Sequence, residues 1–221
     1  MSTATRIWDL PLRLFHWALV VLVSISIYTG LSGGFYEMDY HMMSGYGILA
    51  LVLFRIIWGF IGSTHSRFVS FVSLRSLLPY SRRLFRREPS SMPGHNPLGA
   101  LSVLAFIAVL IIQASTGLFA NDDIFLEGPL THLVSDETSD LLTTVHHINV
   151  KVLFGLLGLH LLAIAFHELY KNERLVSPMF TGKKKGFDTN ATKPVPVIEL
   201  GTAMAILAMT AGFVYGLITY V

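Results

Sequence analysis

Histidines within apolar stretches are the residues of this sequence whose types and spacing best suit chemistry. His146 and His160 are 14 residues apart, which in an α-helix places both on one face, roughly 21 Å apart along the axis. Ionisable side chains inside a membrane are costly and mark functional positions. Imidazole is a common axial ligand of haem iron. One helix that presents two imidazoles at two depths therefore predicts a pair of stacked b-type haems.

The depths of two further histidines supply the partners. His41 opens the second apolar stretch and His146 begins the fourth, both on the outer side. His16 of the first stretch and His160 of the fourth lie towards the inner side. We therefore predict that the pairs His41/His146 and His16/His160 each hold one haem iron. The other histidines are not expected to bind iron: His65, His95, His132, His147 and His167.

The sequence contains no cysteine. This excludes disulfides, iron–sulfur clusters and covalently attached haem, since all of these need thiols. A proton or metal pathway would need carboxylates in the middle of a span. No carboxylate lies there, because Glu168 and Glu199 are at the ends of apolar stretches. A haem-free transporter or scaffold remains as an alternative to the haem protein.

A few small or charged residues near the histidines extend the candidate site. Gly45 lies one turn after the histidine of its stretch, where it provides room either for a porphyrin or for close helix packing. Arg55, inside the same stretch, is predicted to contact a haem propionate or a quinone. Arg13 is predicted either to bind a propionate or to extend to the membrane surface. Lys151 lies off the ligand face, and a quinone, a propionate and the outer loop are all open as its partner.

Five apolar stretches must position these residues. The sequence is 52% hydrophobic and only 14% charged, whereas a soluble domain has about 25% charged residues. A membrane-spanning helix needs about 20 apolar residues. The first stretch is longer than the apolar part of a signal peptide and lacks a nearby small-x-small cleavage site, so we expect a span. The predicted spans are 12–31, 41–62, 98–120, 141–169 and 197–221.

These spans predict the fold class: an all-α integral membrane protein. Four transmembrane helices would form a bundle that holds two haems, and a fifth C-terminal transmembrane helix would be added to it. We expect residues 1–185 to form the di-haem bundle and residues 186–221 to form a linker and the extra helix.

The charges of the loops predict the orientation. Basic loops stay in the cytoplasm, so the N-terminus is expected inside and the C-terminus in the periplasm of a bacterial inner membrane. The strict alternation of basic and acidic loops argues against nucleic-acid binding. Between the second and third stretches the basic residues are Arg67, Arg75, Arg82, Arg83, Arg86 and Arg87, against the single acid Glu88. Between the fourth and fifth stretches they are Lys171, Arg174, Lys183, Lys184, Lys185 and Lys193. The acidic residues of the outer loops are Glu37, Asp39, Asp122, Asp123, Glu127, Asp136, Glu137 and Asp140.

Short motifs at the ends of the stretches carry a family resemblance. They are WDLPLR at 8–13 before His16-Trp17, HMMSGY at 41–46, RIIWGFIG at 55–62, and NERLV at 172–176 after the His146–His160 step. Over about residues 6–185 these motifs resemble the bacterial cytochrome b561 family, which includes the b-type cytochrome subunits of nickel–iron hydrogenases. The resemblance implies two bis-histidine haems b, a four-helix carrier and quinone as a redox partner. It implies the same four ligands, whereas the fifth span and Lys151 depart from the family pattern.

The expected function is electron transfer between the quinone pool and a periplasmic redox partner such as a cytochrome c. The acidic outer loops either dock that partner by charge complementarity or only enforce topology and solubility. One alternative is a membrane anchor and electron acceptor for a nickel–iron hydrogenase or related dehydrogenase. Another is a stand-alone superoxide:quinone oxidoreductase. The sequence leaves open whether the chain is itself an enzyme.

Overall fold

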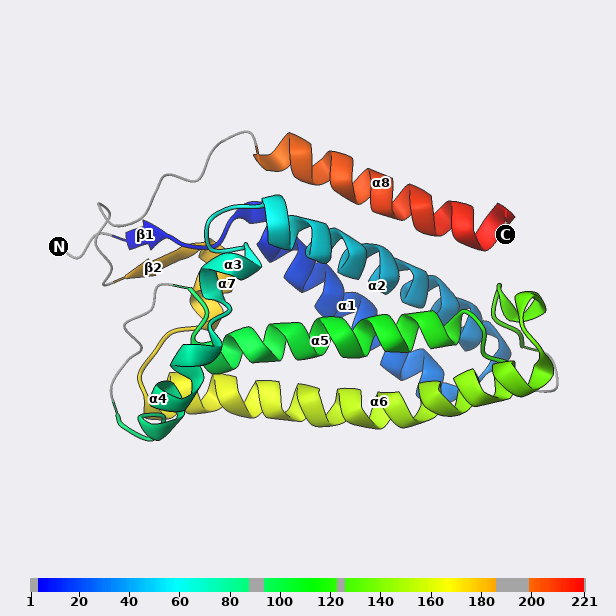
Figure 1. Ribbon diagram of the computed structural model, residues 1–221, viewed down its shortest axis with the longest axis horizontal. Coiled ribbons are helices and arrows are strands. Elements are labelled where there is room, and N and C mark those ends of the chain that lie inside the picture. The colour runs from blue at the N-terminus through cyan, green and yellow to red at the C-terminus, as the bar shows by residue number, and fades with distance from the viewer. Residues whose placement is uncertain (1–3, 88–93, 123–125, 186–198, 221) are drawn as a thin grey trace. The chain divides into compact units, whose positions relative to one another are not determined.

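The structure is a computed structural model that describes residues 4–87, 94–122, 126–185 and 199–220. Long α-helices make up most of it (Figure 1). They are α1 (Leu10–Ser32), α2 (Phe35–Ile61), α5 (Pro97–Gly117), α6 (Asp136–Ala165), which a π-helical turn η3 (Phe166–Tyr170) continues, and α8 (Glu199–Tyr220). The short elements are β1 (Ala4–Arg6), α3 (Phe68–Phe71), η1 (Leu74–Ser76), α4 (Leu77–Arg82), η2 (Thr131–Leu133), α7 (Val176–Thr181) and β2 (Lys183–Lys185).

Five helices of the described chain are long and apolar enough to cross a membrane. Many of their large hydrophobic side chains are exposed, for example Tyr28 at 71%, Leu162 at 69% and Phe213 at 62%. So much exposed apolar surface is unfavourable in water but suits contact with lipid chains. The prediction of a mainly helical, multi-pass membrane protein with five spans is confirmed for the described residues.

Two helices begin five or six residues earlier than the sequence pattern predicted. α2 begins at Phe35 rather than at His41, and α6 begins at Asp136 rather than at residue 141. Hydropathy marks where a helix enters lipid, but the helix itself extends further into the polar region. His41 and His146 therefore lie within their helices, and the acidic residues at their starts complement the helix dipoles. Those first-turn acids are Glu37 of α2 and Asp136 and Glu137 of α6. Glu88, Asp123 and Lys193 lie outside the described residues.

The chain divides into two compact units, each assembled from three segments. The first unit comprises Met1–Leu14, Ile56–Ala105 and Leu156–Ala203. The second comprises Phe15–Arg55, Phe106–Gly155 and Met204–Val221. The division into a bundle at 1–185 and an extra helix at 186–221 stays a prediction, and its linker at 186–198 lies outside the described residues.

In the first unit, the N-terminal segment is attached to the residues that follow α6. β1 pairs antiparallel with β2, with Thr5 opposite Lys184. The N–H of Ile7 then donates to the carbonyl of Gly182 at 2.8 Å. These contacts add two short strands to the all-helical fold that the sequence predicted.

Asp9 fixes the start of α1 in the same unit. Its Oδ1 accepts from the N–H of Leu12 at 2.6 Å, as in a helix N-cap. Its Oδ2 accepts from Trp58 Nε1 at 3.3 Å and from the hydroxyls of Ser63 and Ser66. One fully buried carboxylate therefore joins the start of α1 to the end of α2.

In the second unit, α8 packs against the rest of the unit through an apolar cluster. Val214 of α8 meets Leu49 and Ala50 of α2, together with Leu118 and Leu130. Burial of such side chains stabilises a helix contact by close packing, which is the main attraction available between helices in lipid. The fifth helix is thus an integral part of this unit.

Candidate haem site

Two of the predicted ligands meet in the second unit. The rings of His41 in α2 and His146 in α6 have centroids 6.1 Å apart and an interplanar angle of 77°. A metal–imidazole bond is about 2.0–2.1 Å long and the ring centroid lies about 1.1 Å beyond the nitrogen, so two imidazoles on opposite sides of one iron have centroids roughly 6 Å apart. The observed separation fits a bis-histidine iron.

Backbone carbonyls orient both rings. The Nδ1 of His41 lies 2.8 Å from the carbonyl oxygen of Ser26, and the Nδ1 of His146 lies 2.9 Å from that of Gln113. A carbonyl only accepts hydrogen bonds, so in each ring Nδ1 carries the proton and donates it. The lone pair of Nε2 is then available for a metal, which is the usual arrangement for a ligating histidine.

Gly45 in α2 and Gly155 in α6 leave space in the same unit. A Cβ built on either glycine would meet no atom within 4 Å. An open face at these positions suits a wide, flat group beside the helices. A bare metal ion fits less well, since no group of three or more His, Cys, Asp or Glu side chains suited to a metal is found in the described chain. The donor set and the glycines fit haem.

The other predicted ligand pair lies in two different units. His16 is in the second unit, half-buried, with its ring edge-on to Trp17 at 5.1 Å. His160 is in the first unit and is also half-buried. The pairing of His16 with His160 stays a prediction.

The two predicted arginines differ in their surroundings. Arg55 in α2 is 2% exposed, so a guanidinium is buried within a candidate span. Arg13 in α1 is half-buried, and its Nη1 donates to the carbonyl of Phe180 in α7. Arg13 therefore holds the residues after α6 in place, whereas contact of either arginine with a propionate stays a prediction. Lys151 is exposed.

The polar residues that hold α5 against α6 were missed by the sequence interpretation. Asn149, which is buried, donates through Nδ2 to the carbonyl of Val109 at 3.0 Å and to Oε1 of Gln113 at 2.7 Å. Gln113 thus contacts α6 through its side chain and His146 through its carbonyl. Only the position of Asn149, three residues after His146 and on the same helix face, could have indicated this contact from the sequence.

The histidines predicted not to bind iron have other surroundings. His95 contacts Trp8 and Phe71, with ring centroids 4.7 Å and 4.6 Å away. His132 and His147 are exposed. Burial lowers the pKa of His65. His167, at the end of α6, belongs to a separate polar cluster in the first unit.

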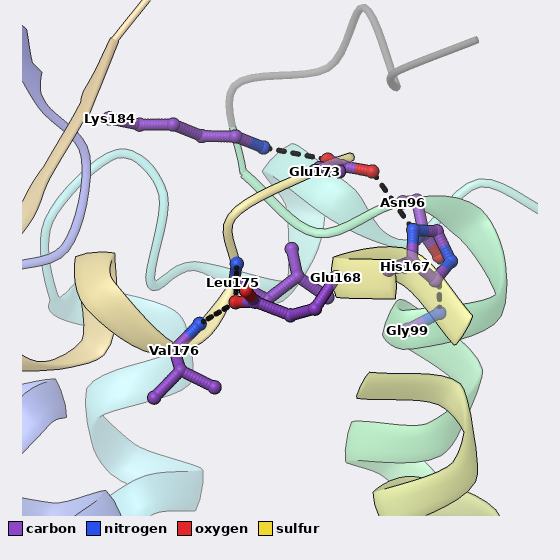
Figure 2. Close-up of polar contacts among 8 residues, drawn as sticks. All are labelled: Asn96, Gly99, His167, Glu168, Glu173, Leu175, Val176 and Lys184. Carbon is purple, nitrogen blue, oxygen red and sulfur yellow. Dashed lines mark hydrogen bonds and ion pairs between the residues drawn. The ribbon is translucent and has the colours of Figure 1, made fainter. Parts of the chain in front are cut away.

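That cluster centres on Glu173 (Figure 2). His167 Nδ1 lies 2.9 Å from Glu173 Oε2, and Lys184 Nζ lies 2.8 Å from Glu173 Oε1. Burial raises the pKa of Glu173, but the hydrogen bonds from His167 and Lys184 outweigh it and bring the pKa down to about 2. Beside this ion pair, Glu168 Oε1 accepts from the N–H groups of Leu175 and Val176 at the start of α7.

Comparisons with known proteins show the family of this chain. The family model described as prokaryotic cytochrome b561 matches residues 7–182. A probable Ni/Fe-hydrogenase B-type cytochrome subunit of Azotobacter chroococcum mcd 1 is 24% identical, over 82% of this chain and 88% of that protein. Proteins with the same name from Azotobacter vinelandii and Rhodobacter capsulatus are 25% and 22% identical, each over 82% of this chain, and over 88% and 82% of their own lengths. No solved structure matches. With its facing histidines, its apolar helices and a family match over most of its length, the chain belongs to the prokaryotic cytochrome b561 family.

Proposed function

We propose that this membrane b-type cytochrome is the electron-accepting membrane subunit of a nickel–iron hydrogenase or a related dehydrogenase, and that it passes electrons to quinone. The observation that carries the redox role is the facing pair His41 and His146. The choice of partner rests on the relatives, which are named as hydrogenase cytochrome subunits and align with 82% of this chain. This partner is better supported than the periplasmic cytochrome c expected from the acidic loops.

The residues of the chain prepare the site for its cofactor. Haem, if bound here, would supply one-electron chemistry, and His41 and His146 would be the residues that hold its iron. His41 and His146 present Nε2, and the carbonyls of Ser26 and Gln113 hold the rings in that orientation. Arg55 is proposed to meet a propionate or a quinone oxygen, because a charge buried within a span is expected to have a functional reason.

We further propose a second haem between His16 and His160, which gives two haems b per chain. The chain would lie in the bacterial inner membrane with its N-terminus in the cytoplasm and its C-terminus in the periplasm, since the basic loops are retained inside.

The partner is tested by hydrogen-dependent reduction. Membranes that contain the chain and a hydrogenase encoded beside it are exposed to H2, and the reduced haem b absorbance is recorded with and without quinone. We expect H2 to reduce haem b in the wild type, and the signal of the haem held by His41 and His146 to be missing in the His146→Ala variant. Reduction of the haems by quinol or superoxide alone, with no response to H2 and no copurifying hydrogenase, would contradict the proposal and favour a stand-alone oxidoreductase.

A further inference from the structure

Two threonine–glycine steps lie behind the facing imidazoles of the second unit. Thr29-Gly30-Leu31 occurs in α1 and Thr116-Gly117-Leu118 occurs at the end of α5. The helices come from distant parts of the sequence, yet both threonines are buried, at 5% and 7% exposed. The same three residues thus occur at two places of this unit, each with a buried threonine.

Each threonine hydroxyl reaches the carbonyl that accepts from a histidine. Thr29 Oγ1 donates to the carbonyl of Ile25 at 2.7 Å and to that of Ser26 at 3.3 Å. Thr116 Oγ1 donates to the carbonyl of Ile112 at 2.7 Å and to that of Gln113 at 3.1 Å. The carbonyls of Ser26 and Gln113 are the acceptors for His41 and His146 respectively. Both imidazoles thus share their backbone acceptor with a threonine. A hydroxyl also lies 3.3 Å from each Nδ1: that of Ser26 beside His41 and that of Thr116 itself beside His146.

Each glycine lies against the back of the same imidazole. A Cβ added at Gly30 would lie 2.8 Å from both Cε1 and Nδ1 of His41. A Cβ added at Gly117 would lie 3.0 Å from Cε1 and 3.3 Å from Nδ1 of His146. Distances under 3.0 Å force a shift, so a side chain at Gly30 would displace the ring of His41 or α1 itself.

We propose that the Thr29-Gly30 and Thr116-Gly117 steps are matched positioning elements that set the orientation and electron-donating strength of the two ligand imidazoles. The glycine allows the ring to sit directly against the helix, within reach of the carbonyl. The threonine shares that carbonyl and so weakens the hydrogen bond from Nδ1. A weaker bond there makes the imidazole a poorer electron donor to iron. This inference rests on the proposed binding of a haem between His41 and His146.

The contacts predict an asymmetry between the two steps. The steric effect of adding a methyl group is larger at Gly30, where the Cβ would lie closer to the ring. The electronic effect of removing a hydroxyl is smaller at Thr116, because its Oγ1 also lies 3.3 Å from Nδ1 of His146 and its removal takes away a weak acceptor as well as a competing donor. Both effects act on the same haem.

The steric part is tested with Gly30→Ala and Gly117→Ala. The matched control is Gly47→Ala, because a Cβ at Gly47 would also lie 2.8 Å from a neighbouring side chain, but from Cδ1 of Leu22 and not from a histidine. Haem per chain and the low-spin electron paramagnetic resonance spectrum are measured on each purified protein. We expect Gly30→Ala to shift the signal of one haem or lose that haem, Gly117→Ala to do so to a lesser degree, and Gly47→Ala to match the wild type.

The electronic part is tested with Thr29→Val and Thr116→Val, which keep the side-chain shape. Without the hydroxyl, the carbonyl accepts a hydrogen bond from Nδ1 alone, and that bond becomes stronger. The imidazole then donates more electron density to iron and stabilises its ferric state. Redox titration is expected to show a negative shift of one haem midpoint potential with haem content unchanged, and the shift should be larger for Thr29→Val.

Unchanged spectra and potentials in the glycine and valine variants, in a protein whose haem is lost on His41→Ala, would overturn the inference and leave the proposed function standing. Equal changes in Gly47→Ala would also overturn it, since general overpacking would then be the cause. If the wild-type chain binds no haem, or His41→Ala retains all of it, the proposed site itself fails.

Discussion

α6 and its π-helical extension present histidines to both units of the molecule, and the two differ in what holds them. In the second unit, His146 donates through Nδ1 to a neutral backbone carbonyl and lies 6.1 Å from the ring of His41. In the first unit, His167 is held by the carboxylate of Glu173, which also binds Lys184. One histidine is thus held by the dipole of a carbonyl, and the other by a carboxylate that is part of an ion pair.

We therefore expect His146 to be a haem ligand, and the cluster of His167, Glu173 and Lys184 to act as a structural clamp. A carbonyl orients an imidazole and leaves Nε2 neutral and available, which suits metal binding. A buried carboxylate paired with both a histidine and a lysine satisfies its charges internally and ties three segments of the chain together. Burial alone does not distinguish the two roles, because the partner of Nδ1 decides between them.

The sharpest test replaces each histidine in turn. His146→Ala is expected to lose one of two haems, since an axial ligand is removed, whereas His167→Ala should retain both. Haem per chain is measured by reduced-minus-oxidised spectra against protein concentration. His41→Ala should lose the same haem as His146→Ala, and His16→Ala and His160→Ala the other. Equal haem loss in a folded His167→Ala protein would break the distinction.

Removal of the charge at the centre of the clamp should affect stability and not haem. Glu173→Gln keeps the shape but leaves Lys184 and His167 with a neutral partner, and disruption of a buried ion pair costs about 4 kcal/mol. Thermal unfolding in detergent should show a lower midpoint, with haem per folded chain unchanged. A variant as stable as the wild type would show that Glu173 is not the centre of a clamp.

Acid should weaken the clamp over a defined pH range. The pKa of Glu173 is about 2 in the folded chain, below its ordinary value of 4.5. Its contribution of about 3 kcal/mol is therefore complete above pH 4.5 and is lost as the pH falls from 4.5 towards 2. Unfolding midpoints measured between pH 7 and pH 3 should converge for the wild type and Glu173→Gln. A constant difference over this range would contradict the assignment.

The smallest effect is expected at the edge of the clamp. Glu168 accepts from the N–H groups of Leu175 and Val176, at 2.7 Å and 2.9 Å. Glu168→Ala removes this cap of α7 and should cost about 1 kcal/mol, whereas Glu168→Gln keeps an acceptor and should cost less. Thermal unfolding in detergent is again the measurement. Equal losses in the two variants would assign the effect to charge and not to capping.

Much of the fold could be predicted from the sequence because its causes are local. Apolar stretches of sufficient length predicted the five spans, and the 14-residue step from His146 to His160 follows from helix periodicity. The ends of helices were less predictable: α2 begins at Phe35, since polar residues such as Glu37 continue a helix beyond the apolar stretch. The β1–β2 pairing was missed because it joins residues from opposite ends of the described first unit.

The partners of the site residues could not be read from the sequence in the same way. The family motifs pointed to the family, which the comparisons confirm. They did not indicate the carbonyls of Ser26 and Gln113, because every residue has a carbonyl and only helix packing selects one. The repeated Thr-Gly-Leu step was visible in the sequence, but its meaning depends on two histidines that are 15 and 33 residues away from their acceptors.

The sequence by itself determined that the chain crosses a membrane, that histidines lie within the crossings, and that no thiol can hold a cofactor. Each of these follows from composition or from the regular rise and turn of a helix. Only the tertiary structure decided that His41 faces His146, and that His167 instead meets Glu173 and Lys184. The reason is physical: the partner of an imidazole is chosen by how separate helices pack, and sequence distance does not encode that packing directly.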